Sequence, residues 1–144
     1  VGTTLPKHLR TISVATFVNA TGEPQLETEV TRAVLQEVQR EGQLTLLDQR
    51  SAAIRLTGTL TSYTLEPMRY DQNRPRTVSE YRSLVKARIR AVEARTGKVI
   101  VEQTVVGDNT FIAAGDLTTM RRMALPEAAR QAAHEIVNAV VSSW

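Results

Sequence analysis

The segment from Arg69 to Arg90 holds the side chains of this sequence best suited to binding chemistry. It contains seven bases and two acids, a local charge of +5 in a chain whose formal net charge is +3. Most of the bases are arginines, whose planar guanidinium forms forked, charge-assisted hydrogen bonds with phosphates and carboxylates. The segment is therefore a candidate site for a multiply anionic ligand. The candidate residues are Arg82, Lys86, Arg88 and Arg90 on one strand face, and Arg69, Arg74 and Arg76 in the loop before it. The alternative is a solvated sheet face with no ligand.

Motifs for catalysis are absent from the rest of the sequence. The chain has no cysteine, which excludes thiolate metal sites, disulfides and a cysteine nucleophile. Its two histidines, His8 and His134, are not spaced from each other or from carboxylates as the ligands of a metal ion are. His134 is expected to pair with Glu135 on a helix surface. No nucleophile elbow, phosphate loop or dinucleotide fingerprint occurs. We predict a protein that is not an enzyme and has no metal or cofactor; a hydrolase using an unrecognised pair of carboxylates is the alternative.

Nucleic-acid binding is disfavoured despite a sequence isoelectric point near 9.7. Sheets that bind single strands need exposed aromatic side chains on which bases stack. Only six aromatic residues occur, and none forms an interleaved basic and aromatic strand motif. Phe17 and Tyr81 are more simply interpreted as core residues. The basic segment is therefore expected to bind another kind of anion.

The first half of the chain predicts a strand, a helix and a second short strand. Residues Leu9–Val18 alternate as a strand, and Pro24 marks the start of a helix that ends at Gly42 in a left-handed conformation. A short strand is expected over Leu44–Asp48. The apolar face of this helix is predicted to be Leu26, Val30, Ala33, Val34 and Val38.

The second half predicts a hairpin followed by a helix. The expected strands are Ala53–Leu65, with Tyr63 on its exposed side, then Val78–Ala94 and Val99–Val106, with loops over Pro67–Thr77 and Gly107–Asp116. The last helix is expected over about Thr118–Ser142, capped by Asp116, Thr118 or Thr119, and kinked or divided at Pro126. The main alternative is a helix that starts at Pro126 itself. Its interior face is predicted to be Met123, Ala129, Ala132, Ala133, Ile136, Val137, Val140 and Trp144.

These elements give one α+β domain over residues 1–144. Two one-faced helices and a one-faced sheet pack most economically as a two-layer sandwich. The fold prediction is two helices on one face of a mixed four-stranded sheet, in the order β-α-β-β-β-α.

The order of motifs resembles the LPS-assembly lipoprotein LptE family of Gram-negative bacteria. The resemblance rests on three stretches that together cover nearly the whole chain. They are Leu5–Asn19 followed by Glu23-Pro24, then Leu56–Tyr63 with Glu66-Pro67 and Tyr70-Asp71, and Glu80-Tyr81-Arg82 leading to Thr96–Ile100.

The resemblance implies a lipoprotein on the periplasmic side of the outer membrane, anchored by a lipidated cysteine that would precede Val1. It also implies a plug for the β-barrel translocon LptD that binds lipopolysaccharide through basic residues. Tyr63, Pro67 and Tyr70 are the expected barrel contacts, although Tyr63 could equally be a cross-strand packing partner.

A second resemblance leaves another function open. The opening Ile12–Gly22, followed by a helix and Gly42–Asp48, is also similar to envelope lipoproteins that regulate a peptidoglycan synthase or form a secretion assembly. Such a protein would bind a synthase or copies of itself rather than a barrel. The Leu56–Tyr63 and Glu80–Arg82 stretches favour the first interpretation.

Overall fold

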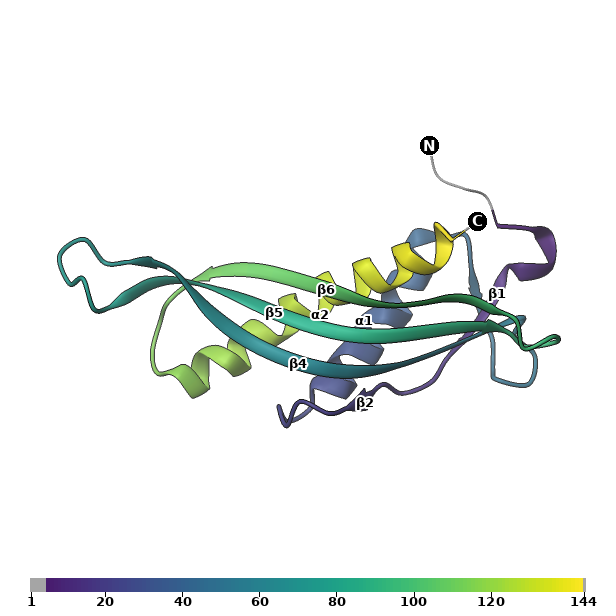
Figure 1. The fold of residues 1–144 in the computed structure, drawn as a ribbon, viewed down its shortest axis with the longest axis horizontal. Helices are drawn as coiled ribbons and strands as arrows, with labels where there is room; N and C mark the ends of the chain where they lie inside the picture. The colour runs from purple at the N-terminus through teal and green to yellow at the C-terminus, as the bar shows by residue number, and fades with distance from the viewer. Residues whose placement is uncertain (1–4, 144) are drawn as a thin grey trace.

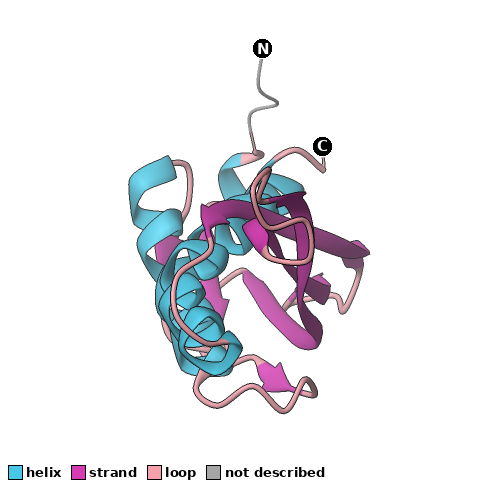
Figure 2. Cartoon of the chain, turned by 90° about the vertical axis from the view of Figure 1, so that its left-hand side faces the viewer, coloured by secondary structure: helices cyan, strands magenta, loops and turns pink. Residues whose placement is uncertain are grey.

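The computed structural model describes residues 5–143 as two layers, with both helices on one face of a mixed sheet (Figure 2). The elements are η1 (Lys7–Leu9), β1 (Thr11–Val14), β2 (Val18–Asn19), α1 (Leu26–Glu41), β3 (Thr45–Leu46), β4 (Ile54–Tyr70), β5 (Val78–Glu93), β6 (Val99–Ile112) and α2 (Leu117–Val141). The α+β sandwich predicted from the sequence is confirmed.

The sheet combines parallel and antiparallel pairs in the order β3-β1-β4-β5-β6, with β2 also paired to β4. The short strands β1, β2 and β3 pair in parallel, whereas β4, β5 and β6 form a long antiparallel meander. Figure 1 shows these three strands running along the long axis of the molecule. The first described residues and the end of α2 lie toward one end of it, and the β4–β5 hairpin lies at the other.

Within the described residues the sheet has six strands where four were expected, because the first strand is divided in two and the short segment expected over Leu44–Asp48 forms a separate strand, β3, beside β1. The predicted first strand is divided into β1 and β2 around Phe17, whose ring is buried against Gly58. A Cβ at Gly58 would lie 2.3 Å from a ring carbon of Phe17, so only glycine leaves room for this ring. The backbone N–H of Phe17 donates to Thr31 of α1 instead of continuing a strand ladder.

Two predicted loops are largely strand. β4 continues through Pro67 to Tyr70, and β6 continues to Ile112, because both strands pair with the first residues of β5. Proline is tolerated in β4 because β1 and β2 pair only with its first part, so Pro67 lies where one side of β4 is an unpaired edge. Only the tip of the expected Pro67–Thr77 loop is left as a turn.

The five apolar residues predicted for α1 are all buried, and Gly42 ends the helix at a φ of 87°. Asp116 caps the start of helix α2, where its carboxylate accepts from the backbone N–H of Thr119 at 2.8 Å. The predicted division at Pro126 is wrong, and so is the alternative start there, since α2 is one helix from Leu117 to Val141 that passes through an exposed Pro126.

The inner face of α2 is rich in alanine, and this allows a close approach to the sheet. A Cβ at Gly107 of β6 would lie 2.3 Å from the backbone nitrogen of Ala132. The predicted interior position of Met123 is wrong, because its side chain is 72% exposed near the start of the helix. Trp144, also predicted for this face, lies outside the described residues.

Candidate functional site

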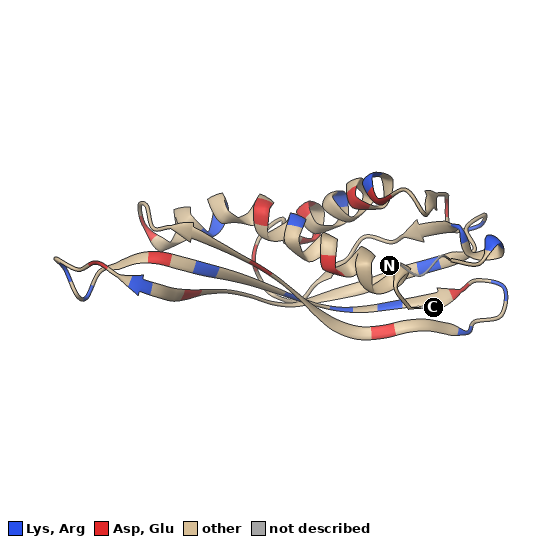
Figure 3. Ribbon diagram, turned by 90° about the horizontal axis from the view of Figure 1, so that it is seen from above, with Lys and Arg blue, Asp and Glu red and all other residues tan. Residues whose placement is uncertain are grey.

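The basic residues of β5 lie on the sheet face opposite the helices, which we call the open face. Val85, Ala87, Ile89 and Ala91 are buried beneath the helices, and the residues that alternate with them point away. Lys86, Arg88 and Arg90 are exposed, and Arg82 is half-buried. This is the alternation predicted from the sequence, and Figure 3 shows the basic residues recurring along the strands. At about 3.3 Å per residue, the row from Arg82 to Arg90 is about 26 Å long.

Two of these four cations are paired with carboxylates of the neighbouring strand β6. Both Nε and Nη2 of Arg82 donate to the same carboxylate oxygen of Asp108, at 3.0 and 2.6 Å. The Nε of Arg90 lies 3.4 Å from Glu102. All four side chains of these two ion pairs are partly exposed to solvent, so each pair contributes little to the stability of the fold. They do, however, neutralise the two ends of the basic row.

The centre of the row is not neutralised in this way. Within the part of the chain that the structure describes, neither Lys86 nor Arg88 forms an ion pair. Their cross-strand neighbours are uncharged: Ser62 and Val106 flank Lys86, and Thr59 and Thr104 flank Arg88. A shallow groove of about 250 Å³ runs beside Arg88 and Arg90, with Thr57, Thr59 and the exposed Val18 in its walls. An anion can therefore reach Arg88 from this groove, whose wall also holds Glu102, and can reach the exposed Lys86 from solvent.

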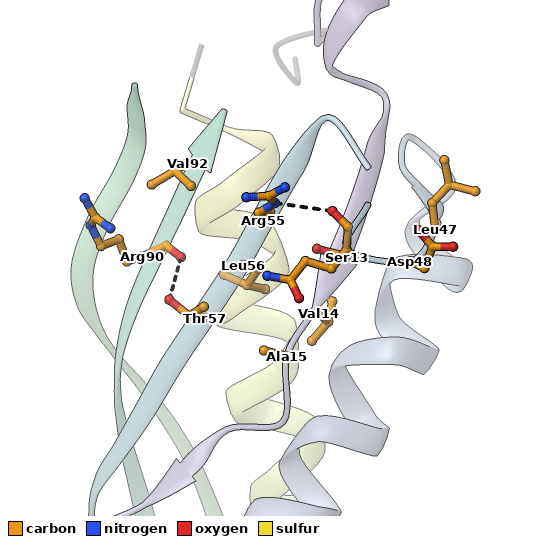
Figure 4. A pocket seen from close by; sticks show the side chains of 11 residues that line it. Ser13, Val14, Ala15, Leu47, Asp48, Arg55, Leu56, Thr57, Arg90 and Val92 are labelled. Atoms are coloured by element: carbon orange, nitrogen blue, oxygen red, sulfur yellow. Dashed lines mark hydrogen bonds between the residues drawn. The ribbon is translucent and has the colours of Figure 1, made fainter. Parts of the chain in front are cut away.

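A second hollow of about 320 Å³ continues this groove toward β1 and shares Thr57 and Arg90 with it. Figure 4 shows Arg55 on β4 reaching toward the β3–β4 loop, where its Nε donates to the carbonyl of Gln49 at 3.3 Å. Arg55 was not among the candidate residues predicted from the sequence. Its period-two position beside Thr57 and Thr59 is the signal that could have placed it on the open face.

The other three predicted cations form a separate group. Arg69 lies near the end of β4, where it is 3.3 Å from Glu80, and Arg74 and Arg76 are exposed in the tip of the β4–β5 hairpin. Because the tip lies beyond the end of the row on β5, the structure does not bring the seven candidates into one site. They divide into an open-face row and a hairpin group.

The exposure expected for Tyr63 is wrong. A register shift between Leu60 and Ser62 moves the following residues of β4 to the other face, so Tyr63 is only 4% exposed. Its hydroxyl donates to the carbonyl of Arg121 at 2.8 Å, and the Arg121 guanidinium lies 5.0 Å above its ring. Burial raises the pKa of Tyr63 to about 12. Tyr63 is thus a packing residue, whereas Pro67 and Tyr70 are exposed.

The described residues do not bring together a metal-binding cluster or a free pair of carboxylates. Residues 5–143 contain no group of three or more metal-ligating side chains. His134 pairs across the helices with Glu37 at 3.1 Å, rather than with Glu135 as expected. A hollow between the starts of α1 and α2 holds two acids, Glu23 and Glu29, but each forms an ion pair with an arginine. This pairing is not the arrangement expected of a carboxylate acid–base couple.

None of the helices within residues 5–143 has the length and apolar character needed to span a bilayer.

Comparisons with known proteins give both a family and a shared fold. The sequence model of the LptE family, described as lipopolysaccharide-assembly, matches residues 9–140. The hypothetical protein CT253 from Chlamydia trachomatis has a similar structure, with a TM-score of 0.62 at 10% identity, covering 88% of this chain and 92% of that one. Protein XCC0632 from Xanthomonas campestris also gives 0.62, at 11% identity, covering 96% and 90%.

The rare lipoprotein B from Shewanella oneidensis gives a TM-score of 0.50 at 18% identity, covering 88% of this chain and 90% of that one. At these identities the structural likeness shows the fold alone. No curated protein matches the sequence.

Proposed function

This chain belongs to the LptE family of lipopolysaccharide-assembly lipoproteins, which are not enzymes, and we propose that it binds lipopolysaccharide through the open face while partnered with an LptD-type outer-membrane β-barrel. In this proposal a lipid anchor at the N-terminal end holds the protein on the periplasmic side of the outer membrane. The family match favours this role over a regulator of a peptidoglycan synthase or a secretion assembly.

The observation that carries the proposal is the pair of exposed, unneutralised cations Lys86 and Arg88 at the centre of the open face. The phosphates of lipid A are multiply anionic, and neighbouring cations about 7 Å apart on one strand face can each contact a different phosphate oxygen. The threonines beside Arg88 add hydroxyl donors for sugar groups. Binding at this surface needs no rearrangement of the core, because the helices cover only the other face.

The paired cations have a different role in this proposal. Arg82 and Arg90 already hold Asp108 and Glu102, so an incoming phosphate must compete with a carboxylate for each guanidinium. Over the length of the row, and counting Arg55, the open face carries five cations against Glu66, Glu102 and Asp108; Glu80, on the same face nearer the hairpin, pairs with Arg69. It therefore has a modest positive excess, concentrated near Lys86 and Arg88. We expect these two residues to contribute most of the affinity.

The barrel partnership draws on the other properties of the same surface. The lumen of a large outer-membrane barrel is polar, and the exposed strand positions of β4 and β6 on the open face are mostly threonine and charged residues. Pro67 and Tyr70 at the hairpin remain available as barrel contacts, whereas the buried Tyr63 does not.

Lipopolysaccharide binding is tested with three variants of the full chain. We expect K86Q/R88Q to lose at least tenfold in affinity for purified lipopolysaccharide at 0.15 M salt, R82Q/R90Q to lose less, and the variant combining all four changes to retain none. R50Q/R95Q removes the same charge from exposed loop positions and serves as the matched control. Equal losses in K86Q/R88Q and R50Q/R95Q would show that only net charge matters, and would contradict the proposed site.

The barrel partnership is tested by co-expressing the chain with the LptD-type barrel of the same organism. A stoichiometric complex purified from membranes supports the proposal. Recovery of the chain with soluble partners alone counts against it. A complex that forms normally with K86Q/R88Q would assign these residues to lipopolysaccharide rather than to the barrel.

A further inference from the structure

Exposed apolar side chains are concentrated at the end of the molecule where the β4–β5 hairpin lies. Met68 and Tyr70 are 48% and 55% exposed at the end of β4, Ile112 is 73% exposed at the end of β6, and Leu117 and Met123 are 51% and 72% exposed in the first turns of α2. We call these five residues the hairpin-end surface. Ile112 and Met123 line one hollow between β6 and α2. Met68 and Tyr70 flank Arg69, which lies two strands from Ile112 through Glu80, so they belong with them by their place at this end of the sheet.

We propose that the hairpin-end surface docks onto the interface of an anionic lipid bilayer. Apolar patches rimmed by cations are typical of proteins that lie on membranes, where the apolar groups enter the acyl boundary and arginines remain at the headgroups. Tyrosine is enriched at the same depth because its ring is apolar and its hydroxyl is polar. This role goes beyond lipopolysaccharide binding and uses different residues from the open-face row; it shares only Tyr70 with the proposed barrel contacts.

The charges around the surface favour an anionic bilayer as the occupant. The hairpin between Met68 and Val78 has three arginines, of which Arg69 pairs with Glu80, and one acid, Asp71. Asp71 is held by its own turn, where it accepts from the backbone N–H groups of Asn73 and Arg74 at 2.7 and 3.1 Å. Among residues 5–143, Arg74 and Arg76 form no ion pair. A second copy of this chain would bring these arginine tips together, which disfavours self-association here.

The shape of the surface distinguishes a bilayer from a single bound acyl chain. A shallow hollow of about 280 Å³ lies between β6 and α2, with Phe111, Ala114 and Met120 in its walls. Phe111 stacks on Tyr81, with ring centroids 6.0 Å apart, which supports this part of the sheet from within. Ile112 and Met123, however, project from the rim and are largely exposed. Protruding apolar side chains insert into a bilayer, whereas enclosing one chain needs a deep cavity.

The experiment is flotation of the full chain with large unilamellar vesicles of pure phosphatidylcholine or of 70% phosphatidylcholine and 30% phosphatidylglycerol. We expect the unmodified chain to float only with the anionic vesicles. I112S/M123S changes two exposed side chains and so should fold normally, and we expect it to lower the partition coefficient at least tenfold. R74Q/R76Q should lower it by a similar factor, since each arginine near such a surface contributes about fivefold.

Two control variants separate this proposal from the open-face site. R50Q/R95Q removes two charges elsewhere, and V18S/L47S removes two exposed apolar side chains outside the hairpin end. Both should float as the unmodified chain does. The proposal is overturned if the unmodified chain does not float, or if a control loses as much binding as I112S/M123S. It is also overturned if K86Q/R88Q alone abolishes flotation, or if I112S/M123S instead dissociates a dimer in analytical ultracentrifugation.

Discussion

Removing the carboxylates of the open face should strengthen lipopolysaccharide binding. In the folded chain Asp108 and Glu102 hold the guanidinium groups of Arg82 and Arg90, at 2.6 and 3.4 Å. In D108N or E102Q the freed arginine can turn to a phosphate, and the phosphate no longer meets a negative neighbour. These substitutions should therefore act in the opposite direction to the arginine substitutions, although they alter the same ion pairs.

The expected size follows from Coulomb's law. A carboxylate about 6 Å from a bound phosphate repels it by about 0.7 kcal/mol in water. The exposed ion pair that the ligand must break has a strength of about 0–1 kcal/mol. Together these terms come to about 1 kcal/mol for each substitution, or about a fivefold gain in affinity. The double variant should gain roughly 25-fold if the two sites act independently, as distant sites usually do.

The assay is equilibrium binding of labelled lipopolysaccharide at 0.05, 0.15 and 0.5 M salt. The gain should be largest at the lowest salt, because screening shortens the reach of exposed charges. E135Q, on the exposed side of α2, raises the net charge by the same amount and is the matched control. An unchanged or weaker affinity of D108N for lipopolysaccharide would refute the reasoning, because it would show that Asp108 does not compete with the bound phosphate for Arg82. A gain of the same size in E135Q would reduce the effect to net charge.

Three further predictions concern the scaffold that holds the open face. In G107A the new Cβ would lie 2.3 Å from the backbone of Ala132. The substitution should therefore destabilise the fold by about 3 kcal/mol, the upper end for overpacking, and lower Tm by about 10 °C. An unchanged Tm would contradict the close packing of β6 and α2. The hydrogen bond from Arg40 lowers the pKa of Glu37, so stability from this carboxylate is present above its unfolded pKa and lost as pH falls through the folded value. The free energy of unfolding measured in urea should therefore fall more steeply on acidification in the unmodified chain than in E37Q. Parallel plots of this free energy against pH would exclude the effect. Y63F should lose about 1–2 kcal/mol, because a carbonyl of α2 loses its donor, and should remove a phenol that otherwise ionises only near pH 12 in absorbance titration.

Period-two and helical spacing in the sequence were enough to identify the two layers. The buried face of α1 and the alternation of β5 are decided by which residues are apolar, and both were predicted correctly. The spacing also placed Lys86, Arg88 and Arg90 on a common face away from the helices. A residue's position on a regular element depends only on local geometry, so sequence alone is sufficient to predict it.

Features that depend on strand register could not be predicted in this way. The register shift after Leu60 buried Tyr63, and pairing with β5 turned the expected loop around Pro67 into strand. The pairing of Arg82 with Asp108 likewise depends on the alignment of β5 with β6, since the two residues are 26 apart in the sequence.

The sequence by itself therefore determined the family, the fold class and the basic strand face. Only the tertiary structure decided which of the basic residues are neutralised, and which belong to the hairpin end rather than to the open face. The physical reason is that charge and periodicity are properties of single residues and short segments. Neutralisation and exposure instead depend on side chains that distant segments bring together.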